Sequence, residues 1–503
     1  MRAARQFSRR NRQKVRFSFY TISRSRAKQK TFAEAASRSI FRWKSKLTRA
    51  ERLRITKENK MTCPRKLLHA GATSEGAAMK LAQARLIPSI LPVSRRRSRP
   101  RIDGEHSGGS PRRVLFILEN LPVPLDRRAW QEARALRDAG YVVSVVCPRN
   151  ERCAKATEII DGIHIFRHWL PNDARGISEY FLEYGAALFW EFVLTFRVML
   201  RRGFDVIHAG NPPDTIFLVG GFFKLLFGKK FVFDYRDMAP ELFEVKFGRR
   251  GLLHQLLLAC ERWTFRVADR VIANNPTFAE IAVRRGQKRR EDITVVRHGP
   301  DLGMLRRVEI ERDYRCGRRH LVLYVGVMGS QDGVDLLIQA AHHTICGLGR
   351  CDVQFLLVGA GPELRAMQAL AMSLGIDEYV TFTGFLTGRE FLETLSSADI
   401  GVAPDPKNPL NDSMSMNKIL EYMSFGLPVV MFDLVEGRNL AGECGVYARD
   451  NDPQELARQL VSLLDNSVRR KALGRAARER AKLFSWEKEA QFLLAAYDDL
   501  WAA

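Results

Sequence analysis

Cysteine is scarce in this sequence, and the few cysteines do not form pairs. The chain has 503 residues but only 8 cysteines. The cysteines are scattered along the chain without the paired spacing of metal ligands, and the opening residues lack the apolar stretch and cleavage site of a secretory signal. We therefore expect a reduced, cytoplasmic protein without a metal site built on cysteine.

Long uninterrupted apolar runs are also lacking. A helix that spans a bilayer needs about 18 or more apolar residues. The nearest candidate, residues 181–200, is interrupted by Glu183, Glu191 and Arg197. We expect an apolar helix near residues 178–201 that packs in a core. Peripheral contact of part of this helix with the inner face of a cell membrane is the alternative.

Most of the chain has no excess of charge, although the formal net charge is +25. Residues 1–113 hold 31 of the 81 basic residues and 6 of the 56 acidic residues, so the rest of the chain carries 50 of each. A folded domain that binds nucleic acid is expected to be basic itself. We therefore expect no nucleic-acid partner for the folded part.

The basic segment, residues 1–111, is rich in Arg and Ser and has no helical or alternating period. Such a composition is typical of disorder. The segment could be a basic arm for nucleic-acid or lipid phosphates, or an organelle transit peptide. It could also be an extension that precedes a true start at Met61 or Met79, which is the interpretation we favour.

From residue 112 onward, short apolar runs alternate with amphipathic stretches. Continuous apolar strands separated by helices predict an α/β fold with parallel sheets that are covered on both faces. The pattern pauses in an Arg-rich linker at residues 302–320 and then begins again. We predict two doubly wound domains facing each other across a cleft, followed by a helix that packs back on the first domain. Their expected bounds are 112–300, 301–483 and 484–503.

Residues 409–430, PLNDSMSMNKILEYMSFGLPVV, predict a helix followed by a turn and a strand. They carry one cation, Lys418, and one carboxylate, Glu421, a single helical turn apart. A helix N-terminus favours anions, a carboxylate can accept two hydrogen bonds from a vicinal diol, and a Lys can neutralise phosphate. The stretch could hold a nucleoside diphosphate, with the ribose on Glu421. An ordinary surface pair on a helix is the alternative.

Several segments resemble, in order, the retaining glycosyltransferases of family 4. The sequence KILEYMSFGLPVV resembles their signature helix and turn, FDYRDMAPE a strand end with an Arg/His-Asp pair, and VRHGPD the Asn-Gly-x-Asp hinge. The stretches ENLPVPLDRRAWQEARAL, YVGVMGSQDGVDLLIQA, FTGFL and SADIGVAP add to the likeness. It covers residues 112 to about 500 and is greatest to the branch that builds bacterial surface polysaccharides and glycolipids.

The resemblance implies a GT-B fold, two Rossmann-like domains that face each other. It also implies a metal-independent, hexosyltransferase-like enzyme without a cofactor. Its donor would be a UDP- or GDP-linked sugar, and its acceptor a glycan or a polyprenyl- or lipid-linked molecule. A nucleotide-sugar epimerase of the same architecture is the alternative.

The resemblance also implies roles for individual residues. The donor is expected to contact Gly326, Gly329, Ser330, Gln331, Gly384, Phe385, Ser413, Asn417, Lys418 and Glu421. The acceptor is expected to contact Asn120, Arg127 and Arg128. The catalytic candidates are Arg236, Asp237 and His208, with His208 ranked below Asp237.

Two departures from the family pattern lie on the donor side. The family has a second Glu, separated from the first by seven residues, where this chain has Ser413. A serine can form a hydrogen bond with the sugar but cannot stabilise positive charge on its ring. Many members also carry an Arg and a Lys in the donor loop, where this chain has Val327 and Gln331-Asp332. We expect backbone amides of the loop and Lys418 to compensate at the diphosphate.

A third departure lies on the acceptor side. Arg236 stands where many family members have a His before the Asp. An Arg can hold an anionic group, but it cannot act as a general base at neutral pH. We expect Arg236 to hold a phosphate or an acceptor anion, and Asp237 to orient the acceptor hydroxyl.

Overall fold

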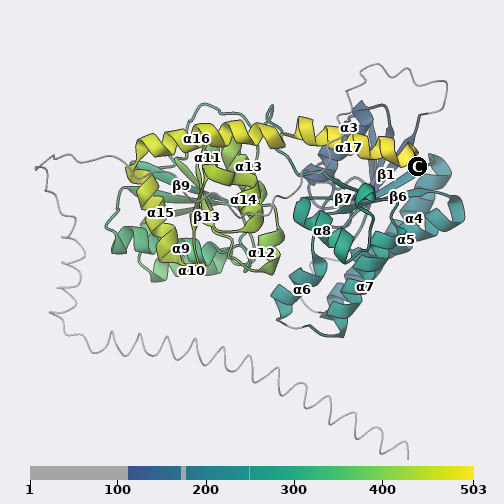
Figure 1. Ribbon diagram of the computed structural model, residues 1–503, viewed down its shortest axis with the longest axis horizontal. Coiled ribbons are helices and arrows are strands. Elements are labelled where there is room, and N and C mark those ends of the chain that lie inside the picture. Colours follow the sequence, from purple (N-terminus) through teal and green to yellow (C-terminus); the bar gives the residue numbers. More distant parts are fainter. Residues whose placement is uncertain (1–110, 171–176, 249, 503) are drawn as a thin grey trace, which may run out of the picture. The chain divides into compact units, whose positions relative to one another are not determined.

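The computed structural model describes residues 111–170, 177–248 and 250–502. These residues all belong to one compact unit of the chain. The predicted Arg/Ser-rich extension, residues 1–111, lies outside the described residues apart from Pro111. Within the described part, two separate sheets have the element order of two doubly wound domains (Figure 1).

The first sheet has eight strands in the order β3-β4-β2-β1-β5-β6-β7-β8. The strands are β1 (Arg113–Ile117), β2 (Val142–Pro148), β3 (Thr157–Ile160), β4 (Ile163–His168), β5 (Val206–Gly210), β6 (Lys230–Tyr235), β7 (Arg270–Ala273) and β8 (Ile293–Val295). The helices between them are α3 (Arg127–Asp138), α4 (Ile177–Arg201), α5 (Phe217–Phe227), α6 (Ala239–Phe247), α7 (Leu252–Val267) and α8 (Pro276–Arg284). We call this part the N-terminal sheet domain.

One edge of this sheet differs from the expected parallel arrangement. Strand β3 pairs with β4 in the antiparallel sense. The two are joined by Asp161 and Gly162, both of which have positive φ. An Asp-Gly pair with positive φ at both positions forms the tight turn that a hairpin needs. The other described strands of the sheet are parallel, as predicted.

The second sheet has six strands, all parallel, in the order β11-β10-β9-β12-β13-β14. The strands are β9 (His320–Val325), β10 (Val353–Val358), β11 (Val380–Gly384), β12 (Ile400–Ala403), β13 (Val429–Phe432) and β14 (Gly445–Ala448). The helices are α9 (Val334–His342), α10 (Leu364–Ser373), α11 (Gly388–Ser397), α12 (Pro409–Ser413), α13 (Asn417–Ser424), α14 (Val435–Ala441), α15 (Pro453–Asp465) and α16 (Ser467–Ala481). We call this part the C-terminal sheet domain.

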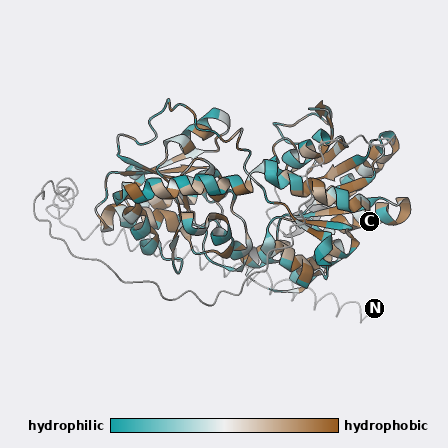
Figure 2. Ribbon diagram, turned by 45° about the horizontal axis from the view of Figure 1, so that its top comes forward, coloured by the Kyte–Doolittle hydropathy of each residue, from teal (hydrophilic) through white to brown (hydrophobic). Residues whose placement is uncertain are grey.

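The central strands of both sheets are buried on both faces, which explains why these strands are continuously apolar. In β9, Val322 and Tyr324 pack into one core cluster, whereas Leu321 and Leu323 pack into another. Successive side chains of a strand point to opposite faces, so each face has its own core. Figure 2 shows the apolar colouring along the central strands. The predicted α/β fold is therefore confirmed.

The last helix, α17 (Trp486–Ala502), packs on the N-terminal sheet domain. Leu493, Tyr497 and Leu500 are buried in the core cluster that contains residues of β1 and β2. Figure 1 shows α17 beside α3. The chain thus returns to its first sheet after completing the second.

Among the described residues, none of the helices combines the length and apolar character that a membrane span requires. The predicted apolar helix near 178–201 is present as α4. Its buried side includes Leu194 and Val198, which belong to a core cluster of the N-terminal sheet domain.

Candidate functional site

Helix α13 carries the two charged residues of the predicted donor motif. The Nζ atom of Lys418 donates to both carboxylate oxygens of Asp405, at 2.9 and 3.0 Å, and the residue is 8% exposed. Burial alone would lower the pKa of Lys418, but the charge of Asp405 outweighs this effect and the pKa lies above its usual value. Lys418 is therefore a charged but already paired cation.

Glu421 lies one turn further along α13, and its side chain is 14% exposed. Burial raises the pKa of Glu421, although Arg127 and Lys418 act in the opposite direction. Its Oε1 atom accepts a hydrogen bond of 3.1 Å from Nη1 of Arg127, a residue of the N-terminal sheet domain. The structure thus brings together Glu421 and Arg127, which were predicted to serve the donor and the acceptor separately.

Ser413 ends helix α12, at the position where the resembled family has its second Glu. Its Oγ atom donates to the carbonyl oxygen of Pro409 at 3.0 Å, one turn earlier in the same helix. Its own carbonyl oxygen accepts a hydrogen bond of 2.8 Å from Asn275 of the N-terminal sheet domain. The hydroxyl group is therefore bound within its helix in this structure.

The predicted diphosphate loop, residues 326–333, connects β9 to α9. The backbone amide of Gly329 donates to Asp332 Oδ2 at 2.9 Å, and Ser330 is exposed. The carbonyl oxygen of Gln331 accepts from the Asn411 side chain at 3.1 Å. A Cβ atom at Gly326 would lie 3.4 Å from Cε of Lys418, so the start of the loop adjoins the Lys418 side chain.

The backbones of neighbouring loops pack directly against the backbone of this loop. A Cβ atom at Gly359, which has a φ of +142°, would lie 1.8 Å from the carbonyl oxygen of Gly326. A Cβ atom at Gly333, which has a φ of +65°, would lie 2.0 Å from the carbonyl oxygen of Pro404. Only glycine fits both the conformation and the space at these two positions. The loops after β9, β10 and β12 are therefore packed together through their backbones.

Two further predicted donor residues lie at the end of β11. Gly384 has a φ of +76°, and its carbonyl oxygen accepts from the amide of Gly359 at 2.9 Å. Phe385 is 60% exposed. The guanidinium of Arg152, a residue of the N-terminal sheet domain, lies 5.6 Å from the centre of the Phe385 ring.

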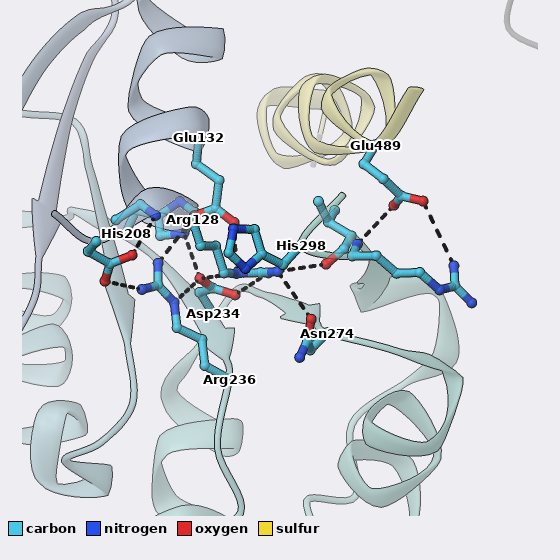
Figure 3. Close-up of polar contacts among 12 residues, drawn as sticks. Arg128, Glu132, His208, Asp234, Arg236, Asn274, His298 and Glu489 are labelled. Carbon is cyan, nitrogen blue, oxygen red and sulfur yellow. Dashed lines mark hydrogen bonds and ion pairs between the residues drawn. The ribbon is translucent and has the colours of Figure 1, made fainter. Parts of the chain in front are cut away.

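Arg236, a predicted catalytic residue, takes part in a network of charged side chains at the ends of β5 and β6 (Figure 3). Its Nη1 atom donates to Asp126 at 2.9 Å, its Nη2 atom to Glu132 at 3.3 Å, and its Nε atom to Asp234. Its side chain is 13% exposed. An anionic ligand would therefore have to compete with three acidic side chains for Arg236.

Arg128, predicted to contact the acceptor, belongs to the same network and is buried. Its Nη2 atom donates to Asp234 at 2.7 Å, and its Nη1 atom to the carbonyl oxygen of Val296 at 3.0 Å. Burial alone would raise the pKa of Asp234, but Arg128 and Arg236 outweigh it and hold the pKa well below its usual value. Arg128 thus stabilises the sheet end and does not face solvent.

His208 and Glu132 complete the network. The His208 ring is fully buried, stacks on Phe116 and shares a hydrogen bond of 2.9 Å with the Tyr497 hydroxyl of α17. Burial lowers the pKa of His208 and, with help from the charge of Asp234, raises the pKa of Glu132 to about 8. A neutral His208 and a protonated Glu132 leave equal numbers of positive and negative charges among the remaining members, Asp126, Arg128, Asp234 and Arg236.

Glu132, His208 and Asp234 are also close enough together to hold a metal ion, since one ligand atom from each lies within 4.8 Å of the others. Both carboxylates, however, contact the guanidinium groups of Arg128 and Arg236. Two buried cations at this distance would repel a divalent ion. The three residues fit an ion-pair network better than a metal centre.

The other acceptor-side candidates lie close to this network. Asp237 is partly buried, and its backbone N–H and C=O both bond to the Asn211 side chain. Asn120 is exposed and lies just beyond the end of β1. Arg127 directly precedes Arg128, and its side chain is 55% exposed.

Asn417, at the start of α13, contacts the segment between the two sheets. Its Nδ2 atom lies 3.0 Å from Nδ1 of His298. Burial, together with the nearby Arg128, lowers the pKa of His298 to about 3, so the ring is neutral and its Nδ1 can accept this hydrogen bond. His298 belongs to the VRHGPD segment that resembles the family hinge.

Sequence reasoning missed the acidic partners and His298. Asp405, Asp126, Glu132 and Asp234 bind the cations that were expected to be available for ligands. A buried partner for Asp234 could have been predicted from the sequence, because an acidic residue inside the apolar run FVFDY requires one. The partner itself, Arg128, is 106 residues away in the chain and only the fold identifies it.

Comparison with known proteins agrees with this architecture. A family model described as "Glycosyl transferase 4-like domain" matches residues 125–299, and one described as "Glycosyl transferases group 1" matches residues 319–466. The two matches fall on the N-terminal and C-terminal sheet domains, respectively.

Three known proteins illustrate the similarity. A D-inositol 3-phosphate glycosyltransferase of Salinispora tropica is 29% identical over 368 residues, which cover 68% of this chain and 73% of the relative. A GDP-mannose-dependent alpha-(1-6)-phosphatidylinositol dimannoside mannosyltransferase of Mycobacterium tuberculosis is 27% identical over 35% of this chain and 43% of its own length. The structure of Anabaena HepE in complex with UDP and glucose is 18% identical, with a TM-score of 0.58, over 77% of this chain and all of that one.

The two doubly wound sheet domains and their structural neighbours define a GT-B glycosyltransferase fold. The chain belongs to the group 1, family 4-like glycosyltransferases. It is therefore a transferase, and the family predicted from the sequence is confirmed.

Proposed function

We propose that this glycosyltransferase transfers a sugar, with retention, from a UDP- or GDP-linked donor to a glycan or a polyprenyl- or lipid-linked acceptor. The donor class is supported by Glu421, a partly buried carboxylate one helical turn after the paired cation Lys418. Lys418 also adjoins the loop that follows β9. In this arrangement Glu421 accepts from the ribose, and the diphosphate lies near Lys418 and the first turn of α13.

The transfer we propose uses no metal and no cofactor. The bond between the sugar and the donor phosphate breaks, a bond to the acceptor oxygen forms, and the leaving phosphate takes the proton of the acceptor hydroxyl. Asp237 is the candidate that orients this hydroxyl. Arg236 and His208 support the sheet end from which Asp237 projects, as their contacts with Asp234 and Tyr497 suggest.

A panel of nucleotide sugars tests this proposal. A donor that binds should raise the unfolding temperature of the full chain by the mass-action relation. The stabilising donor, labelled in its sugar, is then incubated with glycan and lipid-linked acceptors. We expect a new glycosidic bond with retained anomeric configuration. An isomerised free sugar nucleotide without transfer would instead favour the epimerase alternative.

We also propose that the N-terminal sheet domain binds peripherally to the cytoplasmic face of a membrane. Helices α4 and α5 lie side by side, with the Phe192 and Phe222 ring centres 5.5 Å apart. They expose several large apolar side chains: Phe189, Val193, Phe196, Leu200, Leu218, Leu225, Leu226 and Phe227. Arg197 and Arg201 are exposed on α4. Apolar side chains flanked by cations suit an interface with anionic lipid.

Sedimentation with lipid vesicles tests the membrane proposal. Leu225 and Leu226 are 85% and 64% exposed, so replacing both with Ser should leave the fold intact. We expect the wild type to sediment with vesicles that contain phosphatidylglycerol, and the double variant to lose most of this binding. The control is Leu483→Ser, a 56% exposed leucine outside these helices. Equal binding of all three proteins would contradict the proposal.

A further inference from the structure

The carboxylate that the proposed function assigns to the donor ribose is already bound in this structure. Oε1 of Glu421 accepts from Nη1 of Arg127 at 3.1 Å. Arg127 is the hydrogen-bonding partner of the Glu421 carboxylate within the described part of the chain. A ribose diol that binds across both oxygens of the carboxylate would use the same Oε1 atom as Arg127, so the two compete for this acceptor.

The backbone that carries Arg127 is held firmly on both sides. Asp126 caps helix α3 by accepting from the amide of Ala129 at 2.9 Å, and its other oxygen accepts from Arg236. Arg128 is fixed to Asp234 in the buried network. Arg127 therefore projects from a rigid helix start toward the C-terminal sheet domain.

The Arg127 side chain itself is free to leave. It is 55% exposed, and its guanidinium also lies 5.7 Å from the centre of the Phe391 ring. Because the guanidinium is exposed, water competes with Glu421 for it, and the pair is weaker than an ion pair that is buried on both sides. The ion pair between Arg127 and Glu421 can therefore form in the donor-free enzyme and still break when a nucleotide binds.

We propose that Arg127 is a latch on the donor site: it binds Glu421 in the donor-free enzyme, and the donor ribose competes with it for the Oε1 atom. The inference rests on the proposed role of Glu421. It adds that a residue of the N-terminal sheet domain, which the sequence assigned to the acceptor, sets the affinity for the donor. Removing the guanidinium should make nucleotide binding tighter, because the free enzyme no longer holds a competing group.

Calorimetry with UDP, GDP and inorganic pyrophosphate tests the latch. In the full chain, Arg127→Gln should bind the preferred nucleoside diphosphate about 1.5- to 5-fold more tightly than the wild type. Binding of pyrophosphate, which has no ribose, should not change. The matched control is Arg134→Gln, because Arg134 lies on the same helix, is 44% exposed and pairs with Asp161 at 3.8 Å. This control should bind all three ligands as the wild type does.

The alternatives give different results. If Arg127 binds phosphate, the variant will bind both UDP or GDP and pyrophosphate more weakly, and the latch is wrong. Unchanged nucleotide affinity in Arg127→Gln, with a wild type that binds, overturns the latch alone. A wild type that binds neither nucleotide overturns the proposed donor class and the latch with it.

A double-mutant cycle without ligand provides a second measurement. The unfolding temperatures of Arg127→Gln, Glu421→Gln and the double variant should be non-additive if the pair exists in solution. Strict additivity would overturn the latch even if the nucleotide affinities had changed.

Discussion

Different kinds of contact lie at the ends of the strands in the two sheet domains. In the N-terminal sheet domain, the ends of β5 and β6 are occupied by charged side chains that neutralise one another. In the C-terminal sheet domain, the loops after β9, β10 and β12 meet through glycine backbones, and one buried ion pair, Lys418–Asp405, lies beside them. The first arrangement fixes charged side chains in place, whereas the second packs the loop backbones against one another.

This difference affects how the domains can serve a ligand. Guanidinium groups that hold three acidic side chains, as Arg236 does, give a rigid support but have little capacity left for substrate. Glycines at the loop contacts let the main chains of neighbouring loops lie directly against one another around the start of the proposed donor loop. Variants in either sheet domain test this difference, and they follow in order from the largest expected effect to the smallest.

The largest effect is expected in the buried network of the N-terminal sheet domain. Asp234→Asn removes a charge that pairs with both Arg128 and Arg236. Loss of one partner from a buried ion pair costs about 3–5 kcal/mol, because the remaining charge stays buried and unpaired. Urea unfolding of the full chain measures the loss. Arg458→Gln, which breaks surface ion pairs with Asp452 and Glu455, is the control and should cost at most about 1 kcal/mol. A similar small loss in Asp234→Asn would refute the role of the network.

The next effect concerns the glycine contacts of the C-terminal sheet domain. Gly359→Ala would place a Cβ atom 1.8 Å from the Gly326 carbonyl oxygen. Overpacking of this kind costs about 1–3 kcal/mol and should also weaken nucleotide binding by moving the loop after β9. Gly349→Ala is the matched control, because Gly349 also has positive φ but its Cβ would meet nothing within 4 Å. Equal losses in thermal stability for both variants would show that the close approach does not matter.

The third effect is a pH dependence caused by Glu132. Its pKa is about 8 in the folded protein, compared with 4.5 for an ordinary Glu. The folded state thus binds a proton that the unfolded state releases, and the stability from protonated Glu132 is lost as the pH rises from about 4.5 through about 8. Glu132→Gln mimics the protonated form, so it should gain thermal stability relative to the wild type as the pH rises through this window. A constant difference across the window would mean that Glu132 is ionised in the folded protein.

The smallest effect is expected for Ser413. Its hydroxyl is bonded to Pro409 within α12, so Ser413→Ala should cost about 1 kcal/mol or less. The affinity for UDP or GDP should change less than about twofold, since the ribose is assigned to Glu421. Calorimetry of the variant measures this. A large loss of nucleotide affinity would place Ser413 in direct contact with the nucleotide.

The sequence predicted the α/β fold well because its signals are local. Apolar runs such as those of β1 and β9 show burial on both faces, and the motif at Lys418 and Glu421 lies on a helix as expected. The Asp161-Gly162 turn shows that a local signal for the antiparallel edge was also present.

The pairings of the site could not be predicted in the same way. Arg127 is 294 residues from Glu421 and Lys418 is 13 residues from Asp405, and neither spacing is a helical or strand period. Whether a cation is available to a ligand depends on which acidic groups the fold brings beside it. A single sequence gives the residue types but not these partners.

The proposed role of Glu421 is tested most directly by calorimetry of the full chain with UDP and GDP. Glu421→Gln should bind the preferred nucleotide about tenfold or more weakly than the wild type, because hydrogen bonds to a charged acceptor contribute about 1.5–3 kcal/mol. The control is Glu479→Gln, at a 70% exposed carboxylate on α16, which should bind as the wild type does. If Glu421→Gln and the wild type bind the nucleotide equally well, Glu421 does not hold the ribose and the donor site lies elsewhere.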